Sequence, residues 1–240
     1  MATPKITLYF DIVSPFAYIA FHVLKASPIT HNRGSWCLDT NFHFQNSPTF
    51  AGCDISYVPI LLGGLFNACN NTAPINIKNK DKWINVERRR WAKYFSVPIS
   101  DNPPDGFPPR TLAVQRALAA ISHKSPAKLP LVIEALWHSF WVESNSKIGE
   151  PAGFTPVLDG VLGQQATEEV LSAITQPEIK EILASNTDRA FTAGAFGIPW
   201  FECTNSAGES EGFWGIDHLG QVVDFLWLDR SRDPGFKALL

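Results

Sequence analysis

The chain has 240 residues, of which 45% are hydrophobic, and it carries a formal net charge of -3. This length allows one large domain or two small ones, with an ample core. The mild negative charge without a basic stripe argues against nucleic acid and membrane surfaces as partners, and apolar runs such as residues 58–66 are too short to span a bilayer.

The first predicted elements are a strand and a helix that meet at a serine. Residues 5–12 form an apolar run typical of a buried strand, and residues 14–26 are expected to form an apolar helix. Thioredoxin-like proteins carry a Cys-x-x-Cys redox pair at such a junction, but here the sequence is Ser14-Pro15-Phe16-Ala17. Because Ser14 and Ala17 occupy both cysteine positions, a disulfide oxidoreductase is not expected.

Ser14 has two compatible interpretations. Its hydroxyl can donate a hydrogen bond to the thiolate of a bound molecule, at a helix end where the dipole favours negative charge. Alternatively, Ser14 is an N-cap that is followed by a proline at the first helical position.

A second strand is expected at residues 55–62, and Gly63-Gly64 is expected to end it. The preceding residues 27–54 show little periodicity, and such a long connection is uncommon inside a domain. We therefore expect that roughly residues 26–45 are an inserted loop. Two interpretations stay open: a retained intron in the gene model and a genuine surface loop.

A block of helices follows. The spacing of apolar residues predicts a helix from Trp83 onward, and Thr155-Pro156 is expected to be an N-cap followed by a first-turn proline. Further helices are expected at residues 111–122, 129–144, 166–174 and 177–194.

A hairpin and a last helix complete the chain. Residues 200–204 and 209–214 alternate with period two around a turn at 205–208, and a helix is expected at 217–226. The element order predicts an α/β, thioredoxin-like fold with a large all-helical insertion. We expect a thioredoxin-like domain at residues 1–62 and 195–240, and a helical insertion domain at 63–194.

The four cysteines are expected to be reduced and mostly buried, because none belongs to a Cys-x-x-Cys pair. No histidine pair has the spacing of zinc ligands, so no metal site is expected. The N-terminus runs directly into the first strand without a visible signal peptide. We expect a soluble intracellular protein, in the cytosol, the mitochondrial matrix or the peroxisome.

Four motifs carry a resemblance to known proteins. They are Phe10-Asp11-x-x-Ser14-Pro15-x-x-Tyr18, then Asn71-x-x-Pro74 followed by Lys80, then Ala195 to Trp200, and then Phe213 to Asp217. In this order they resemble the kappa-class glutathione transferases and the 2-hydroxychromene-2-carboxylate isomerases, within the wider DsbA-like family. The resemblance covers most of the chain outside residues 26–45, and it implies glutathione as substrate or co-substrate and a homodimer.

The resemblance also implies roles for individual residues. Ser14 would be catalytic and would stabilise the glutathione thiolate. Ile198 would offer its backbone to the cysteinyl unit, with a cis peptide bond to Pro199. Asp217 and nearby backbone amides would hold the γ-glutamyl end, although Ile216 replaces a hydroxyl residue that many of these transferases have there.

The same resemblance assigns Asn71 and Lys80 to the glutathione backbone and its glycyl carboxylate, with Lys80 as a point charge. Solvated loop polar residues remain the alternative, and neighbouring Lys78 and Lys82 leave the register open by a residue or two. The second-substrate pocket is expected at Phe16, Tyr18, Trp83 and Trp200, although most aromatic residues of the helical block are expected in the core. Arg88-Arg89-Arg90 is expected to be a solvated helix face that can serve a dimer interface.

The sequence leaves three functions open. The first is a kappa-like glutathione transferase that adds the thiolate to a hydrophobic electrophile or reduces a hydroperoxide. The second is an isomerase of the hydroxychromene carboxylate type, which uses the same thiolate and returns glutathione. The third is a non-catalytic thioredoxin-like module that binds peptides through the edge at Ile198-Pro199.

Overall fold

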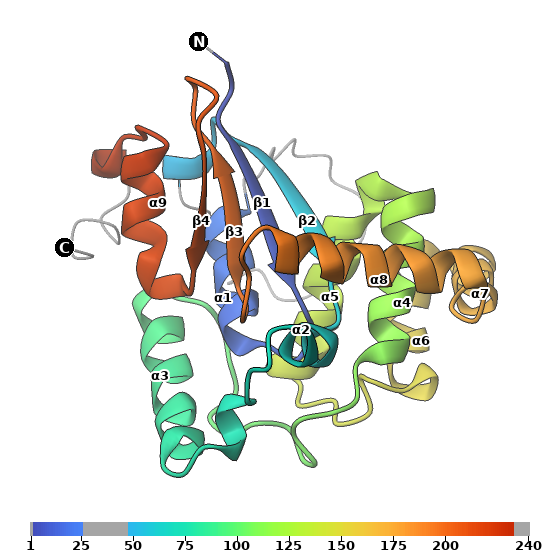
Figure 1. Ribbon diagram of the computed structural model, residues 1–240. Helices are drawn as coiled ribbons and strands as arrows, with labels where there is room; N and C mark the ends of the chain where they lie inside the picture. Colours follow the sequence, from blue (N-terminus) through green and yellow to red (C-terminus); the bar gives the residue numbers. More distant parts are fainter. Residues whose placement is uncertain (1, 26–47, 233–240) are drawn as a thin grey trace, which may run out of the picture.

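The computed structural model describes residues 2–25 and 48–232, so the expected insertion at residues 26–45 lies outside the described residues. Its centre is a sheet with the strand order β2-β1-β3-β4 (Figure 1). β1 (Lys5–Phe10) runs parallel to β2 (Asp54–Pro59), whereas β3 (Trp200–Thr204) runs antiparallel to β1 and to β4 (Ser210–Trp214). The predicted order of strand, helix and strand, then helical block, then hairpin and helix is therefore confirmed.

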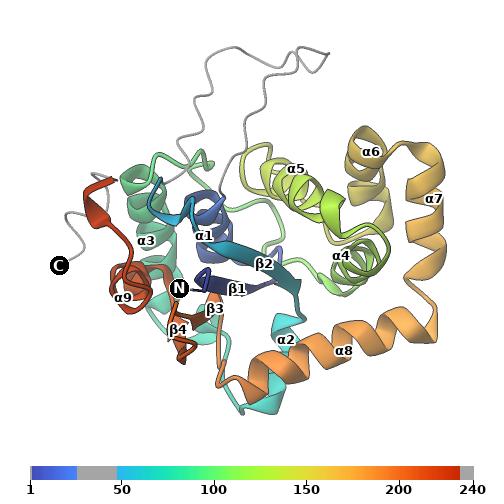
Figure 2. The same ribbon diagram turned by 90° about the horizontal axis from the view of Figure 1, so that it is seen from above.

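The two faces of the sheet bury different side chains, as the period of two requires. Ile6, Leu8 and Phe10 of β1 pack on the face covered by α1 (Pro15–Leu24). Tyr9 points to the opposite face, where α2 (Leu62–Ala68) and α8 (Pro177–Thr192) lie (Figure 2). The sheet is thus a central layer between helices, and the ends of its strands are free to form a site.

The helical block leaves the sheet after β2 and returns to it through α8 (Figure 2). Its main buried core is continuous with that of β1 and α1, and includes fully buried Trp137 and Trp141. The last helix, α9 (Leu219–Phe225), follows one 3-10 turn at Ile216–His218. The remaining helices of the block are α3 (Lys80–Tyr94), α4 (Leu112–Lys124), α5 (Leu129–Trp141), α6 (Pro151–Leu162) and α7 (Gln164–Ala173).

Two local predictions are wrong. Gly63-Gly64 does not end the second strand, since β2 already ends at Pro59 and the two glycines lie inside α2. The first backbone N–H of that helix, at Leu62, donates to the distant carboxylate of Asp11 at 3.0 Å. Thr155-Pro156 does not start a helix, because α6 already begins at Pro151, which takes the tolerated first-turn position. In the same turn, a Cβ on Gly153 would lie 2.0 Å from the carbonyl oxygen of Lys147, so glycine is needed where the helix start meets that loop.

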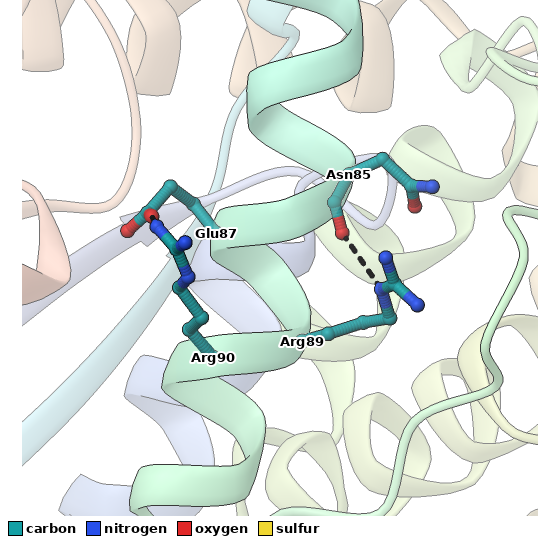
Figure 3. A network of polar contacts seen from close by, with 4 residues as sticks. All are labelled: Asn85, Glu87, Arg89 and Arg90. Carbon is teal, nitrogen blue, oxygen red and sulfur yellow. Dashed lines mark hydrogen bonds and ion pairs between the residues drawn. The ribbon is translucent and has the colours of Figure 1, made fainter.

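The three consecutive arginines of α3 do not share one face. Arg89 donates to the backbone oxygen of Asn85 at 3.2 Å, and Arg90 pairs with Glu87 at 2.6 Å on the surface (Figure 3). Arg88 is 1% exposed, and its guanidinium donates to the carbonyls of residues 100 and 101. The predicted solvated face is correct for Arg89 and Arg90 and wrong for Arg88, which holds the loop after α3.

The described thiols are free: Cys203 is buried, and Cys53 and Cys69 are half-buried. Burial raises the pKa of the Cys53 thiol to about 11. Within residues 2–25 and 48–232, none of the helices combines the length and apolarity that a bilayer span needs. In the same part of the chain, His, Cys, Asp and Glu side chains do not gather in a group of three that would hold a metal ion.

Candidate functional site

A cavity of about 630 Å³ opens where the parallel strands β1 and β2 end. This volume lies within the range of small-molecule pockets, and most of the lining is apolar. Five of the residues predicted for the site line it, namely Ser14, Phe16, Asn71, Lys80 and Ile198. We call residues 11–16 the Ser14 wall and residues 71–80 the Lys80 wall.

Ser14 is 6% exposed and caps α1. Its Oγ accepts a hydrogen bond from the backbone N–H of Ala17 at 3.1 Å, and Pro15 follows at the first helical position. The N-cap interpretation is therefore confirmed. A serine hydroxyl that accepts from the backbone still has its own proton to donate, so the cap leaves an O–H donor at a helix N-terminus in the cavity.

The loop before β3 contributes three residues to the lining of the cavity, Phe196, Gly197 and Ile198. The peptide bond between Ile198 and Pro199 is cis, as expected. Ile198 lines the cavity together with Phe196 and Trp214, whose rings lie 4.9 Å apart. A Cβ on Gly197 would lie 2.8 Å from Nε1 of Trp214, so only glycine lets the indole approach this loop so closely.

The Lys80 wall carries polar groups in solvent. Nδ2 of Asn71 donates to the carbonyl of Phe196 at 2.7 Å and so joins this wall to the loop before β3. Lys80 begins α3 and is exposed. A second exposed cation, Arg110, lines the cavity from the segment before α4. Asp11 is the one carboxylate among the described lining residues, so the solvent-facing charge of the cavity is positive.

Asp11 is completely buried at the base of the Ser14 wall. Its carboxylate accepts hydrogen bonds from the N–H groups of Val13 and Leu62, at 3.2 and 3.0 Å, and from the Thr111 hydroxyl at 2.9 Å. Burial raises the pKa of this carboxyl from 3.8 to about 6, although the three donors lower it. A carboxyl that titrates near neutrality beside a cavity is a functional candidate.

Three residues expected to bind glutathione do not line this cavity: Pro199, Ile216 and Asp217. Pro199 and Ile216 are buried. Asp217 lies on the exposed 3-10 turn before α9, with its Oδ1 3.4 Å from Nδ1 of His218. The residue before this turn is bonded to the loop of the cis peptide bond, because the N–H of Gly215 donates to the carbonyl of Pro199 at 3.0 Å.

Three aromatic residues expected in the second-substrate pocket also lie elsewhere. Tyr18 is fully buried, and its hydroxyl donates to the carbonyl of Pro98 at 2.7 Å. Trp200 is 7% exposed and packs so closely on β4 that a Cβ on Gly212 would lie 2.3 Å from its ring. Trp83 is 53% exposed on α3 but does not contribute to the cavity lining.

The cavity also contains residues to which no role was assigned from the sequence. Asp11 and Trp214 stand within the motifs of the resemblance, so their proximity to the site was a usable signal. The segment before α4 gave no comparable signal, and the cis bond between Phe107 and Pro108 was not expected. This segment contributes Phe107, Pro108, Pro109, Arg110 and Thr111 to the lining, and Leu112 follows as the first residue of α4.

Comparisons with known proteins found a matching family model and several similar proteins. A family model described as a DsbA-like thioredoxin domain matches residues 5–226. The chain is 25% identical over 228 residues to glutathione S-transferase kappa 1 of Caenorhabditis elegans, covering 93% of this chain and 91% of that protein. It is 24% identical over 229 residues to 2-hydroxychromene-2-carboxylate isomerase of Sphingobium xenophagum, covering 93% and 98% respectively.

A solved structure of a 2-hydroxychromene-2-carboxylate isomerase superposes with a TM-score of 0.68 at 20% identity, covering 92% of this chain and 93% of that chain. At this identity the likeness shows the shared fold. The resemblance found in the sequence motifs is thus confirmed at the level of family and fold.

Proposed function

Because the chain belongs to the family of DsbA-like thioredoxin domains, whose model matches residues 5–226, we propose that it is a glutathione transferase of the kappa type. One observation carries the proposal. The cavity brings a cysteine-free helix N-terminus, capped by Ser14, together with the loop of the cis Ile198-Pro199 bond. A site without cysteines cannot exchange a disulfide of its own, whereas a hydroxyl donor at a helix N-terminus could receive a thiol from elsewhere.

The Ser14 hydroxyl would act on the sulfur of bound glutathione. A free thiol has a pKa of about 8.5, and a helix N-terminus with a hydrogen-bond donor lowers it towards neutrality. The thiol proton would leave to solvent, and the Ser14 O–H would donate to the thiolate while its oxygen keeps the bond from Ala17 N. The thiolate would then form a carbon–sulfur bond with an electrophilic carbon of the second substrate. Either a leaving group would depart as an anion, or the electron pair of an activated double bond would shift and take a proton from solvent.

The rest of glutathione would follow the polar groups around the cavity. The cysteinyl backbone would pair with Ile198 in the manner of an added strand. Lys80 would hold the glycyl carboxylate as a point charge. The γ-glutamyl end would pass Trp214, which lines the cavity, towards Asp217, which lies three residues further along the chain.

The apolar remainder of the cavity would receive the electrophile. Phe16 lines it from the Ser14 wall, and further apolar lining residues are Ile77, Ile84, Phe107 and Leu112. Burial of an apolar substrate against such a surface contributes about 25 cal/mol for each Å² removed from water. The second substrate is therefore proposed to be hydrophobic.

A second candidate is a glutathione-dependent isomerase of the hydroxychromene carboxylate type. The observation in its favour is the similarity to such an isomerase over 98% of that relative's length. The same thiolate at Ser14 would add to the substrate and be released again, so glutathione would be regenerated.

Two measurements separate these candidates from a binding module. Calorimetry with glutathione, and with S-methylglutathione as the thiol-blocked control, tests whether the cavity binds the thiol. Failure to bind glutathione at millimolar concentration would contradict both enzymes and favour a peptide-binding module. If glutathione binds, a panel of electrophiles is followed for loss of free thiol. Consumption with each turnover supports the transferase, whereas product without thiol loss supports the isomerase.

A further inference from the structure

Three helices begin at one buried carboxylate. Leu62 is the first residue of α2, Thr111 is the N-cap residue of α4, and Val13 precedes Ser14, the cap of α1. Each donates a hydrogen bond to the carboxylate of Asp11, at 3.0, 2.9 and 3.2 Å respectively. All of these residues line the cavity. The three helix starts that enclose the Ser14 side of the site therefore share one acceptor.

The turn that carries Ser14 has other hydrogen bonds that do not depend on this carboxylate. The carbonyl of Ile12 accepts from the indole N–H groups of Trp137 and Trp141, at 3.1 and 3.3 Å. The side chain of Gln115 accepts from the N–H of Ile12 at 3.4 Å and donates to the carbonyl of Phe10 at 3.1 Å. Removing the Asp11 carboxylate would thus leave the turn bonded, and would release mainly the starts of α2 and α4.

The charge on Asp11 has no ion-pair partner among the described residues. The first turns of α1 and α2 contain no charged side chain. The other charged residues of the cavity lining are Arg110 before α4 and Lys80 at the start of α3, and both are exposed to solvent. Burial of an unpaired carboxylate costs free energy. An apolar side chain would suit the core better at this position. The presence of a carboxylate is therefore best explained by the three hydrogen bonds that it accepts.

We propose that Asp11 is a positioning residue of the thiol site, which fixes the starts of α2 and α4 at a set distance from the turn that carries Ser14. This inference rests on the proposed function, because the walls that it fixes are those between which glutathione would lie. Small displacements matter there, since a misplacement of about 1 Å between reacting groups can cost roughly a hundredfold in rate.

Thr111→Val is the sharpest test, because it removes one of the three donors without changing charge. We expect the dissociation constant for glutathione to rise roughly fivefold and the pKa of the bound thiol to rise as well, since hydrogen bonds to charged groups are among the stronger ones. Thr167→Val is the matched control. Thr167 is 1% exposed, donates to the carbonyl of Gly163 at 3.0 Å, and lies on α7 away from the cavity lining.

The control should lose stability without a change in glutathione affinity or thiol pKa. Asp11→Asn, which keeps the volume of the side chain, should weaken glutathione binding at least as much as Thr111→Val. Wild-type affinity and thiol pKa in Thr111→Val would overturn the proposal, whatever the loss of melting temperature. Thr111→Val also decides the matter if Asp11→Asn does not fold.

Amide hydrogen exchange without glutathione separates this proposal from the proposed function. Faster exchange at the Val13 and Leu62 amides in Asp11→Asn, with no change in Thr167→Val, supports the fixing of the walls. If the two variants show this pattern but the wild type does not bind glutathione, the proposed function fails and the positioning of the walls stands. Unchanged exchange at both amides would contradict the role of Asp11.

Discussion

The two walls of the cavity are built differently. In the Ser14 wall, Asp11, Ser14 and Pro15 are buried. Asp11 accepts hydrogen bonds from the starts of α2 and α4, and the carbonyl of the neighbouring Ile12 accepts one from α5. In the Lys80 wall, Asn71 and Lys80 are exposed, and one side-chain hydrogen bond from Asn71 reaches the loop before β3. The two walls are suited to different tasks. A fixed wall suits the positioning of a sulfur, whereas an exposed wall suits recognition of charged groups that arrive from solvent.

The largest effect is expected at the fixed wall. Ser14→Ala should lower kcat/KM with glutathione about a hundredfold, comparable with the loss of one donor to a developing anion. It should also raise the pH at which the bound thiol ionises, and cost about 1 kcal/mol of stability through the lost cap. Steady-state kinetics and thermal unfolding measure these effects.

Ser14→Thr is the control, because threonine keeps both the cap and the hydroxyl. It should retain most of the activity. Unchanged kinetics in Ser14→Ala at neutral pH would remove Ser14 from the mechanism, and the two walls would then no longer differ in their chemical task.

The buried carboxyl of the same wall should affect stability as a function of pH. Burial raises the pKa of Asp11 to about 6 in the fold, above its ordinary value of 3.8, so the folded state binds the proton more tightly than the unfolded chain does. Its contribution to stability is present below about pH 4 and is lost as pH rises through 6. Relative to Asp11→Asn, the free energy of unfolding of the wild type should fall by on the order of 3 kcal/mol between these limits.

Chemical denaturation at a series of pH values measures this difference. Asp105→Asn, on an exposed turn, is the control and should follow the wild-type profile. If the free energy of unfolding depends on pH in the same way in the wild type and in Asp11→Asn, burial does not dominate the pKa of Asp11. A rise in relative stability with pH would mean that its three donors outweigh burial.

A smaller effect is expected where the loop before β3 contacts Trp214. Gly197→Ala places a Cβ 2.8 Å from Nε1 of the indole, so the ring or the loop must move. We expect a loss of about 1–3 kcal/mol in stability, as for other overpacked sites, and a weaker affinity for glutathione. Calorimetry and thermal unfolding provide the measurements.

Gly160→Ala is the matched control in α6, since a Cβ there would meet nothing within 4 Å. Because alanine favours helix more than glycine does, this variant should gain about 0.5–1 kcal/mol. Equal stability changes in the two variants would show that the contact between Gly197 and Trp214 does not matter.

The smallest effect is expected at the exposed wall. Lys80→Ala should weaken glutathione binding by about two- to fivefold, as expected for a solvent-exposed ion pair, and high salt should reduce the difference. Lys78→Ala and Lys82→Ala serve as controls, because both lysines are exposed but neither lines the cavity. If all three variants behave alike, Lys80 has no specific contact with the ligand.

The sequence predicts those features of the fold that depend on residues close together along the chain. The alternation in the strands, the cap at Ser14 and the hairpin at residues 205–208 are local patterns, and the structure contains them. The three partners of Asp11 could not be predicted in this way, because two of them lie 51 and 100 residues away along the chain. The helix through Gly63-Gly64 was missed for the same reason, since a distant carboxylate caps it.

The aromatic residues show a second limit. Helical spacing indicates that Tyr18 and Trp83 belong to faces of helices, but not which face meets the core. Tyr18 turned out to be buried and Trp83 exposed, and neither lines the cavity. Packing against the helical block decides these positions, and a single sequence does not contain that information.

The central claim is that Ser14 receives the sulfur of glutathione at the N-terminus of α1. The most direct test is a crystal structure of the protein with reduced glutathione. We predict the sulfur within hydrogen-bond distance of Ser14 Oγ, the cysteinyl backbone paired with Ile198, and the Asp11 carboxylate still bonded to Leu62 and Thr111. Glutathione bound with its sulfur away from Ser14, or a cavity left without glutathione at saturating concentration, would contradict the claim.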